Sequence, residues 1–325
     1  MNDILVSDFI ADQLVAFGVT HVFGIIGSAN AYIFDSIYRN KKLELVCLHH
    51  EQACVMAAHG YYMQSGKMAV VLVTAGAGTT NALTGVMGAW ADSVPILIIS
   101  GQESTLQFKN NNICRMIGIQ GVFTESIYSS CTKKVVTCMS AMQAINELDV
   151  CLHLAKEPRQ GPCLIDLPMD IQSEKIGNID LNKTKIIEQK SALKINNINS
   201  SLFDKLIEKI NISTRPLLWL GNGLRASDKT ELESIIKDLS IPYLTSWTAN
   251  DIFAPIENLY AGHAGTYGSR AGNIILQSCD LLITIGTRLS VPQIGYRHDE
   301  IARDADIYVI EIDTLELKKL GPRFK

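Results

Sequence analysis

The chain has 325 residues, of which 47% are hydrophobic and 19% charged, and its formal net charge is only −4. This length suits about two domains with substantial cores. The nearly balanced charge indicates neither a nucleic-acid footprint nor a basic membrane-binding face. Proteins that bind nucleic acids or membrane surfaces are therefore disfavoured.

The cysteines and the N-terminal segment indicate the compartment. Eight cysteines are scattered along the chain without a CxxC pair, so we expect small reduced core residues rather than a disulfide framework. The first predicted helix carries Asp3, Asp8 and Asp12, unlike the basic start of a signal peptide. No apolar segment of the sequence reaches the length that spans a bilayer. We expect a cytoplasmic protein.

Apolar runs alternate with helical patterns through residues 1–175, which we take as the first domain. The spacing predicts strands over residues 21–25, 43–48, 69–75, 95–100 and 162–167. It predicts helices over residues 4–18, 30–38, 51–62, from the loop at 76–81 to about 90, and over 139–156. Residues 102–134 are polar and irregular, as long functional connections often are. The repeated strand, loop and helix order predicts a doubly wound α/β domain with a parallel sheet.

A second α/β domain is predicted over residues 201–325, after a polar linker at residues 176–200. Its expected helices are 201–211, 228–239 and 269–278, and its expected strands are 217–220, 242–245, 281–285 and 307–312. A loop is expected around residues 262–265. The chain stops only a short helix beyond the last strand, so we expect this Rossmann-like domain to be cut short.

Glu51 is the first candidate site residue. It lies where the apolar strand 43–48 gives way to the helix 51–62. Ligands of open α/β sheets collect at the carboxyl ends of strands, so a carboxylate there is placed to meet a ligand. The alternative is that an acid in the first turn of a helix only favours the helix dipole.

Two glycine loops could approach a ligand. The segment Ala75–Asn81 follows a buried strand, and its small residues would let a flat ligand pack against the backbone, although a structural turn is the alternative. The Gly221-Asn222-Gly223 loop could hold a phosphate or form a plain tight turn, because the third glycine of a nucleotide-binding loop is missing.

Two other kinds of chemistry are disfavoured. A zinc motif of the HExxH type would need histidine at position 54, where Cys54 stands. The segment around Ser100 lacks the G-x-S-x-G pattern of serine hydrolases.

Four segments together resemble the thiamine-diphosphate-dependent enzymes, most like the acetolactate synthase large-subunit group. They are FGIIG at 23–27, HEQA at 50–53, TAGAGTTN at 74–81, and DSVPI to SGQ at 92–102. Their order and spacing are similar to those of the family. The resemblance covers the pyrimidine-binding domain, residues 1–175, and extends less specifically over the central domain.

The resemblance implies roles for matching residues. Glu51 matches the glutamate that hydrogen-bonds N1′ of the cofactor's aminopyrimidine, which favours the imino tautomer and lets N4′ take the proton from thiazolium C2. Gln120, twelve residues before Thr132-Lys133, matches a glutamine that faces substrate, so Glu51 and Gln120 are the implied catalytic residues. The implied cofactor-binding residues are Ile26, Gly27, Ser28, Glu51, Thr74, Gly76, Ala77, Gly78 and Asn81.

The implied reaction is decarboxylation of a 2-oxo acid such as pyruvate with carboligation onto a second carbonyl compound, in a homodimer or larger assembly. A simple decarboxylase or an acetyltransferase on the same scaffold is one alternative, and a non-catalytic binding or assembly module is another. Ala77 stands where the family has a loop proline, and Gly121 and Phe123 replace acids, so the acceptor substrate stays open.

The expected cofactors are thiamine diphosphate and Mg²⁺. FAD is not assumed, because GTRLSVPQIG at 286–295 stands where flavin-binding synthases carry an Asp-Asp-Arg run. The family's third domain carries a GDG and Asn motif that holds Mg²⁺ and the diphosphate, and no such motif is found in the 325 residues. We therefore expect the chain to supply the glutamate-bearing half of the site and to be inactive without a diphosphate-binding domain.

Overall fold

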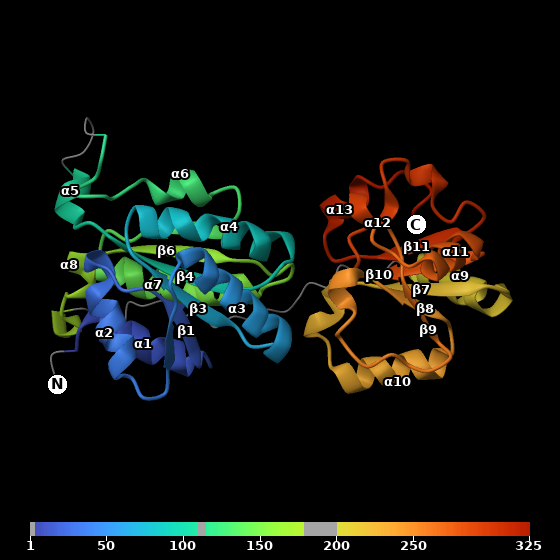
Figure 1. The fold of residues 1–325 in the computed structure, drawn as a ribbon, viewed down its shortest axis with the longest axis horizontal. Helices are drawn as coiled ribbons and strands as arrows, with labels where there is room; N and C mark the ends of the chain where they lie inside the picture. Colours follow the sequence, from blue (N-terminus) through green and yellow to red (C-terminus); the bar gives the residue numbers. More distant parts are fainter. Residues whose placement is uncertain (1–3, 110–114, 179–199) are drawn as a thin grey trace. The chain divides into compact units, whose positions relative to one another are not determined.

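The computed structural model describes residues 4–109, 115–178 and 200–325, and the chain divides into two units, Met1–Ser191 and Ala192–Lys325 (Figure 1). Each unit has one sheet, and every strand pairing within the two sheets is parallel. The predicted class of two doubly wound α/β domains is confirmed. No described helix is long and apolar enough to cross a membrane.

The first sheet has the strand order β2-β1-β3-β4-β6-β5. Its strands are β1 (His21–Gly24), β2 (Glu44–Cys47), β3 (Ala69–Val73), β4 (Ile96–Gln102), β5 (Lys134–Thr137) and β6 (Cys163–Pro168). Its helices are α1 (Val6–Ala16), η1 (Ser28–Asn30), α2 (Ala31–Arg39), α3 (Glu51–Ser65), α4 (Ala77–Ala91), α5 (Thr105–Lys109), α6 (Thr124–Tyr128), α7 (Ala141–Lys156), α8 (Met169–Gln172) and η2 (Ile176–Asn178).

Helices cover both faces of this sheet. Residues of α1, α2 and α7, including Ile10, Ile33 and Leu148, form the core on one face. Residues of α3 and α4, including Val55 and Val86, form the core on the other. The central strands β3 and β4 are buried along their whole length, which explains why their sequences are continuous apolar runs.

The sheet has a topological switch point between β1 and β3. These strands are neighbours, but the chain goes from β1 outward to β2 and from β3 in the opposite direction to β4. The loops that follow the two strands therefore diverge and leave room at the carboxyl edge of the sheet. Ligands of doubly wound folds bind at such points.

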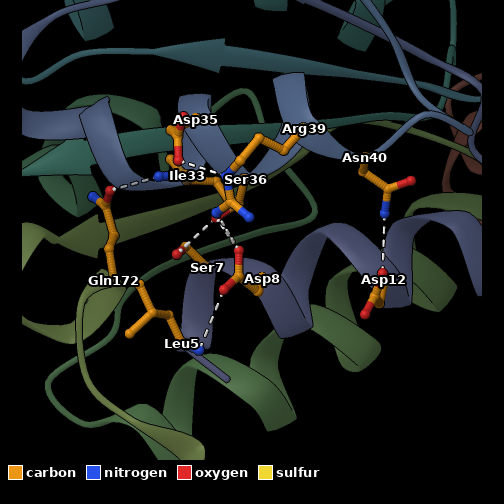
Figure 2. A network of polar contacts seen from close by, with 10 residues as sticks. All are labelled: Leu5, Ser7, Asp8, Asp12, Ile33, Asp35, Ser36, Arg39, Asn40 and Gln172. Atoms are coloured by element: carbon orange, nitrogen blue, oxygen red, sulfur yellow. Dashed lines mark hydrogen bonds and ion pairs between the residues drawn. The ribbon is translucent and has the colours of Figure 1, made fainter. Parts of the chain in front are cut away.

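A polar network joins α1 to α2 and is drawn in Figure 2. The Ser36 hydroxyl and the Arg39 guanidinium each donate a hydrogen bond to Asp8 Oδ1, both at 2.7 Å. Burial acts to raise the pKa of Asp8, but these bonds outweigh it and hold the pKa below its ordinary value. In the first turn of α2, Ile33 N donates a hydrogen bond to Oε1 of Gln172, from α8, at 3.3 Å. The network therefore ties α2 to both α1 and α8.

The second sheet has the strand order β11-β10-β7-β8-β9. Its strands are β7 (Pro216–Leu220), β8 (Tyr243–Thr245), β9 (Tyr260–His263), β10 (Leu281–Ile285) and β11 (Asp306–Ile310). Its helices are α9 (Ser200–Ile212), η4 (Asn222–Ala226), α10 (Lys229–Leu239), η5 (Trp247–Ala249), α11 (Arg270–Ser278), α12 (Val291–Ile294), η6 (His298–Glu300) and α13 (Thr314–Lys318). Leu206 and Ile236 belong to the core on one face and Leu276 to the core on the other.

Three expectations need correction. The segment 102–134 is less irregular than expected, because β4 runs on to Gln102 and two short helices, α5 and α6, follow. The strand β5 was not predicted from the sequence, and the loop expected around 262–265 begins as β9. Both are short edge strands: β5 is only half-buried, and β9 contains Gly262 at a φ of 90° and a register shift. Such strands lack the continuous apolar run of a central strand.

The cysteine prediction was wrong at one position. Cys47 is exposed, because the edge strand β2 is covered incompletely. The buried thiols are Cys54, Cys131, Cys138, Cys151, Cys163 and Cys279. Cys114 and most of the predicted linker at 176–200 lie outside the described residues.

Candidate functional site

Glu51 is the first residue of α3, four positions after the end of β2. His50 caps the helix, and its Nδ1 accepts a hydrogen bond from Gln52 N at 3.2 Å. The Glu51 side chain turns toward the start of α4, where Asn81 Nδ2 donates to its Oε2 at 3.0 Å. A residue of a neighbouring helix thus orients the carboxylate. An acid that only favoured the dipole of its own helix would not need such a contact.

The loop after β3 brings α4 close to Glu51. Gly76 has a φ of 66°, a conformation that favours glycine. A Cβ added to Gly78 would lie 3.3 Å from Glu51 Oε1 and 2.7 Å from Thr74 Cγ2. Any side chain at position 78 would therefore cover the carboxylate. Thr79 fixes the loop, because its hydroxyl donates to Thr74 O at 2.8 Å.

The loop after β1 packs against Thr74, which directly follows β3, on the other side of the switch point. A Cβ added to Gly27 would lie 2.4 Å from Thr74 Oγ1, so the two loops touch through glycine. The buried side chain of Asn30 holds this turn, since its Oδ1 accepts from Gly27 N at 2.7 Å and its Nδ2 donates to Ile25 O at 3.0 Å. Thr74 Oγ1 is buried and has no hydrogen-bond partner among the residues that the structure describes.

Gln120 reaches this cluster from the connection between β4 and β5. Its Nε2 donates a hydrogen bond to Ala75 O at 3.1 Å. The backbone carbonyl oxygen of Gln120 lies against Gly76, and a Cβ added to Gly76 would be only 2.1 Å from this oxygen. A residue far along the chain therefore joins the glycine loop.

The structure thus brings together most of the predicted site residues. Glu51 and Asn81 are hydrogen-bonded, Thr74 contacts Gly27, and Gln120 is bonded to the loop. Four predicted residues, Ile26, Ser28, Ala77 and Asn81, are exposed, with 60% of Ile26 accessible to solvent.

Two acids that support this cluster were not predicted from the sequence. Asp166, in β6, is completely buried, and its Oδ2 accepts hydrogen bonds from Gln102 Nε2 at 2.7 Å and Thr124 Oγ1 at 2.8 Å. Burial raises the pKa of Asp166 to about 6, and the hydrogen bonds offset only part of that rise. Glu103, just after β4, is 8% exposed and accepts a hydrogen bond from Gln120 N. The one sequence signal was an acid inside or directly after an apolar run.

The Gly221-Asn222-Gly223 loop of the second unit is a close-packed turn. A Cβ added to Gly221 would lie 2.1 Å from Gly286 O, and Gly223 N donates to the same oxygen at 3.0 Å. A 3₁₀ helix, η4, begins within the loop at Asn222, and Asp228 caps the α-helix that comes next. These contacts explain both glycines without a phosphate.

Within residues 4–109, 115–178 and 200–325, no group of three or more His, Cys, Asp or Glu side chains is arranged so that it could hold a metal ion. His49, His50 and Glu51 are therefore not part of such a group.

The fold and site define a two-domain α/β protein with a carboxylate and glycine-lined cluster at a switch point. Residues 4–127 match the thiamine pyrophosphate enzyme N-terminal TPP binding domain, and residues 203–323 match the thiamine pyrophosphate enzyme central domain. Together the two matches cover well over half of the chain. The protein belongs to the thiamine pyrophosphate enzyme family.

Several relatives are similar along nearly all of this chain. The acetolactate synthase large subunit of Porphyra purpurea is 32% identical over 317 residues, which are 95% of this chain and 52% of that protein. The acetolactate synthase large subunit of Lactococcus lactis subsp. lactis is 28% identical over 97% of this chain and 53% of its own length. The chain therefore spans about half the length of these relatives.

Proposed function

We propose that this chain supplies the glutamate-bearing side of a thiamine-diphosphate site in an acetolactate synthase-like enzyme. The proposed reaction is decarboxylation of a small 2-oxo acid and carboligation of the acyl unit onto a second carbonyl compound. One observation carries the proposal. Glu51, held by Asn81, faces a glycine loop at the switch point of a thiamine pyrophosphate enzyme fold.

The residues present fit the aminopyrimidine part of the cofactor. Glycine at position 78 leaves Glu51 Oε1 uncovered, and glycine at position 27 keeps a second loop close to Thr74. A buried hydroxyl usually has a hydrogen-bond partner. Thr74 Oγ1 has none in the described part of the chain, and a polar ring edge would supply one. We propose that Ile26, Gly27, Ser28, Thr74, Gly76, Ala77, Gly78 and Asn81 line the ring.

Glu51 is the proposed catalytic carboxylate. When bound, thiamine diphosphate supplies the carbon nucleophile and the electron sink that decarboxylation of a 2-oxo acid needs. The Glu51 carboxylate would hold a proton at a pyrimidine nitrogen, while Asn81 keeps its other oxygen hydrogen-bonded and so fixes its orientation. The Gln120 side chain, tied by one N–H to Ala75 O, has a second N–H and an oxygen with which to orient a substrate.

The proposed site also needs a further domain and other subunits. The relatives are about twice as long as this chain. We propose that the ligands of Mg²⁺ and of the diphosphate come from a further domain, in a longer form of this chain or in a separate one. We propose that the working assembly is a homodimer or larger.

The test combines binding with turnover. Calorimetric titration of thiamine diphosphate and Mg²⁺ against residues 1–325 should show no tight binding, and addition of a diphosphate-binding domain should restore both binding and turnover of pyruvate. In that complete enzyme, Glu51→Gln should lower turnover by about 10²- to 10⁴-fold, the usual contribution of a positioned acid–base group. Turnover by Glu51→Gln at the wild-type rate would refute the proposed role.

Product analysis separates the proposed carboligation from simple decarboxylation. Incubation of the complete enzyme with pyruvate, with and without an added carbonyl acceptor, should give a ligated product. Free aldehyde as the main product would favour a simple decarboxylase.

A further inference from the structure

The turn that carries Gln120 is short and closed on itself. Ile117 and Gly121 form an isolated antiparallel bridge, in which Gly121 N donates to Ile117 O at 2.8 Å. Gly118 has a φ of 57°, and Ile119 at the tip is 85% exposed. The tip of the turn thus contributes little packing of its own. Its position is therefore set by the buried base residue Ile117 and by the side chains that lie beneath the turn.

Glu103 fills the space beneath this turn. The side chain is 8% exposed, and its Oε1 accepts a hydrogen bond from Gln120 N at 3.2 Å. A Cβ added to Gly118 would lie 2.6 Å from Glu103 Oε2, and one added to Gly121 would lie 2.9 Å from Glu103 Cγ. The two glycines therefore leave the room that the carboxylate occupies.

Gln102 holds the other end of the same turn. Its side chain is fully buried, and its Nε2 donates to Val122 O at 3.0 Å and to Asp166 Oδ2 at 2.7 Å. Its Oε1 accepts from Glu103 N at 2.9 Å. Both N–H groups and the oxygen of the amide are thus engaged. A flipped amide would place its oxygen against the Asp166 carboxylate, so Asp166 fixes the direction in which Gln102 donates.

The placement of the turn decides where Gln120 lies relative to the glycine loop. The Gln120 side chain donates to Ala75 O, and its carbonyl oxygen lies against Gly76. The same loop continues to Gly78, next to Glu51. A displacement of the turn would therefore move Gln120 relative to Glu51.

We propose that Glu103 and Gln102, the latter oriented by Asp166, are positioning residues that set the place of Gln120 in the site. The proposal rests on the proposed function, in which Gln120 orients the substrate. Glu103 acts through the backbone of Gln120, and Gln102 acts through the backbone of Val122. Neither residue is assigned contact with the substrate. Misplacement of a catalytic group by about 1 Å can cost about 100-fold in rate.

The first test needs no cofactor. Hydrogen exchange of the peptide that spans residues 115–124 is measured in the full chain for wild type, Glu103→Ala and Glu103→Gln. Glu103→Ala should speed exchange there by about tenfold or more, because it frees the turn. Glu103→Gln should stay near wild type, because its amide oxygen can still accept from Gln120 N. Glu44→Ala, at a residue whose side chain is 68% exposed in the same unit, is the matched control.

A second perturbation acts on the turn from the opposite side. Gly121→Ala would place a Cβ 2.5 Å from Gln102 Oε1 and should speed exchange in the same peptide. If Glu103→Ala fails to fold, Gly121→Ala and Glu103→Gln still decide the question. Exchange that stays within about twofold of wild type in Glu103→Ala, or in Gly121→Ala where only that variant folds, would overturn the proposal.

Kinetics in the complete enzyme distinguish positioning from mere support of the fold. Glu103→Ala should lower kcat for pyruvate by about 10- to 100-fold, and Glu103→Gln should restore most of it. An unchanged kcat with a lower Tm in Glu103→Ala would mean a purely structural role and would overturn the proposal. If no variant, wild type included, turns over pyruvate, the proposed function fails, while the exchange result still decides whether Glu103 places Gln120.

Discussion

The buried acid Asp166 should give the first unit a distinctive pH dependence of stability. Its pKa is about 6 in the folded protein, against an ordinary value of 3.8. The native state therefore binds more protons than the unfolded state between about pH 4 and 6, and the free energy of unfolding falls as pH rises through this window. At about 1.4 kcal/mol for each tenfold change in a binding constant, the loss through Asp166 is about 3 kcal/mol.

Asp166→Asn should remove this dependence. The amide oxygen of asparagine can still accept from Gln102 and Thr124, and its NH₂ replaces Oδ1, which has no hydrogen-bond partner among the described residues. Hydrogen exchange of β3 and β4 amides in increasing urea gives the free energy of unfolding of this unit at pH 4 to 7. The difference in the free energy of unfolding between wild type and variant should shift by about 2 kcal/mol from pH 4 to pH 6, in favour of the variant at the higher pH, because part of the full effect lies outside this window.

Asp8 supplies a control of opposite sign. Its pKa is lowered in the folded protein, so its stabilising effect is present above the unfolded value of 3.8 and is lost as pH falls through the folded pKa. Asp8→Asn should therefore lower stability at pH 7. An Asp166→Asn variant whose stability follows wild type in parallel from pH 4 to 6 would refute the assignment of the slope to Asp166.

Three further predictions concern Asn81, the glycines Gly76 and Gly88, and Cys47. Asn81→Ala removes the hydrogen bond that orients Glu51, and should lower pyruvate turnover of the complete enzyme about tenfold, or about 1.4 kcal/mol, with Tm almost unchanged. Gly76→Ala should lower the free energy of unfolding in urea by about 2 to 4 kcal/mol, because Gly76 has a φ of 66° and the added Cβ would lie 2.1 Å from Gln120 O. Gly88→Ala, where the added Cβ has nothing within 4 Å, should instead stabilise α4 by about 1 kcal/mol. Cys47→Ser should remove one fast-reacting thiol in a titration with a disulfide reagent, since Cys47 is exposed.

The strands that could be predicted from the sequence are those with one strong local signal, a continuous apolar run. The strands β3 and β4 are buried on both faces, so their apolar runs identified them directly. The edge strands β5 and β9 carry no such signal. The half-buried β5 tolerates lysine at its first position, and β9 contains a glycine with positive φ. Tertiary pairing rather than local sequence makes these segments strands.

The site divides in the same way. Glu51 and the glycine loop could be placed from sequence, because a strand end, a helix start and a run of glycines are local features. The support provided by Gln102, Glu103 and Asp166 could not be predicted. It depends on which side chains meet across β4, β6 and a turn some twenty residues away, and no periodicity in the sequence records those contacts.

The register of the first sheet explains why distant segments converge on one cluster. Gly24 of β1 is aligned with Cys47 of β2 and with Leu72 of β3. Glu51 comes only four residues after Cys47, and the loops after β1 and β3 begin within one residue of the same height in the sheet. Because these pairings are parallel, their carboxyl ends share one edge, and each loop contributes its polar or glycine residues there. A slip of one residue between β1 and β3 would separate Gly27 from Thr74 while leaving each loop locally intact, so the register of the sheet assembles the site.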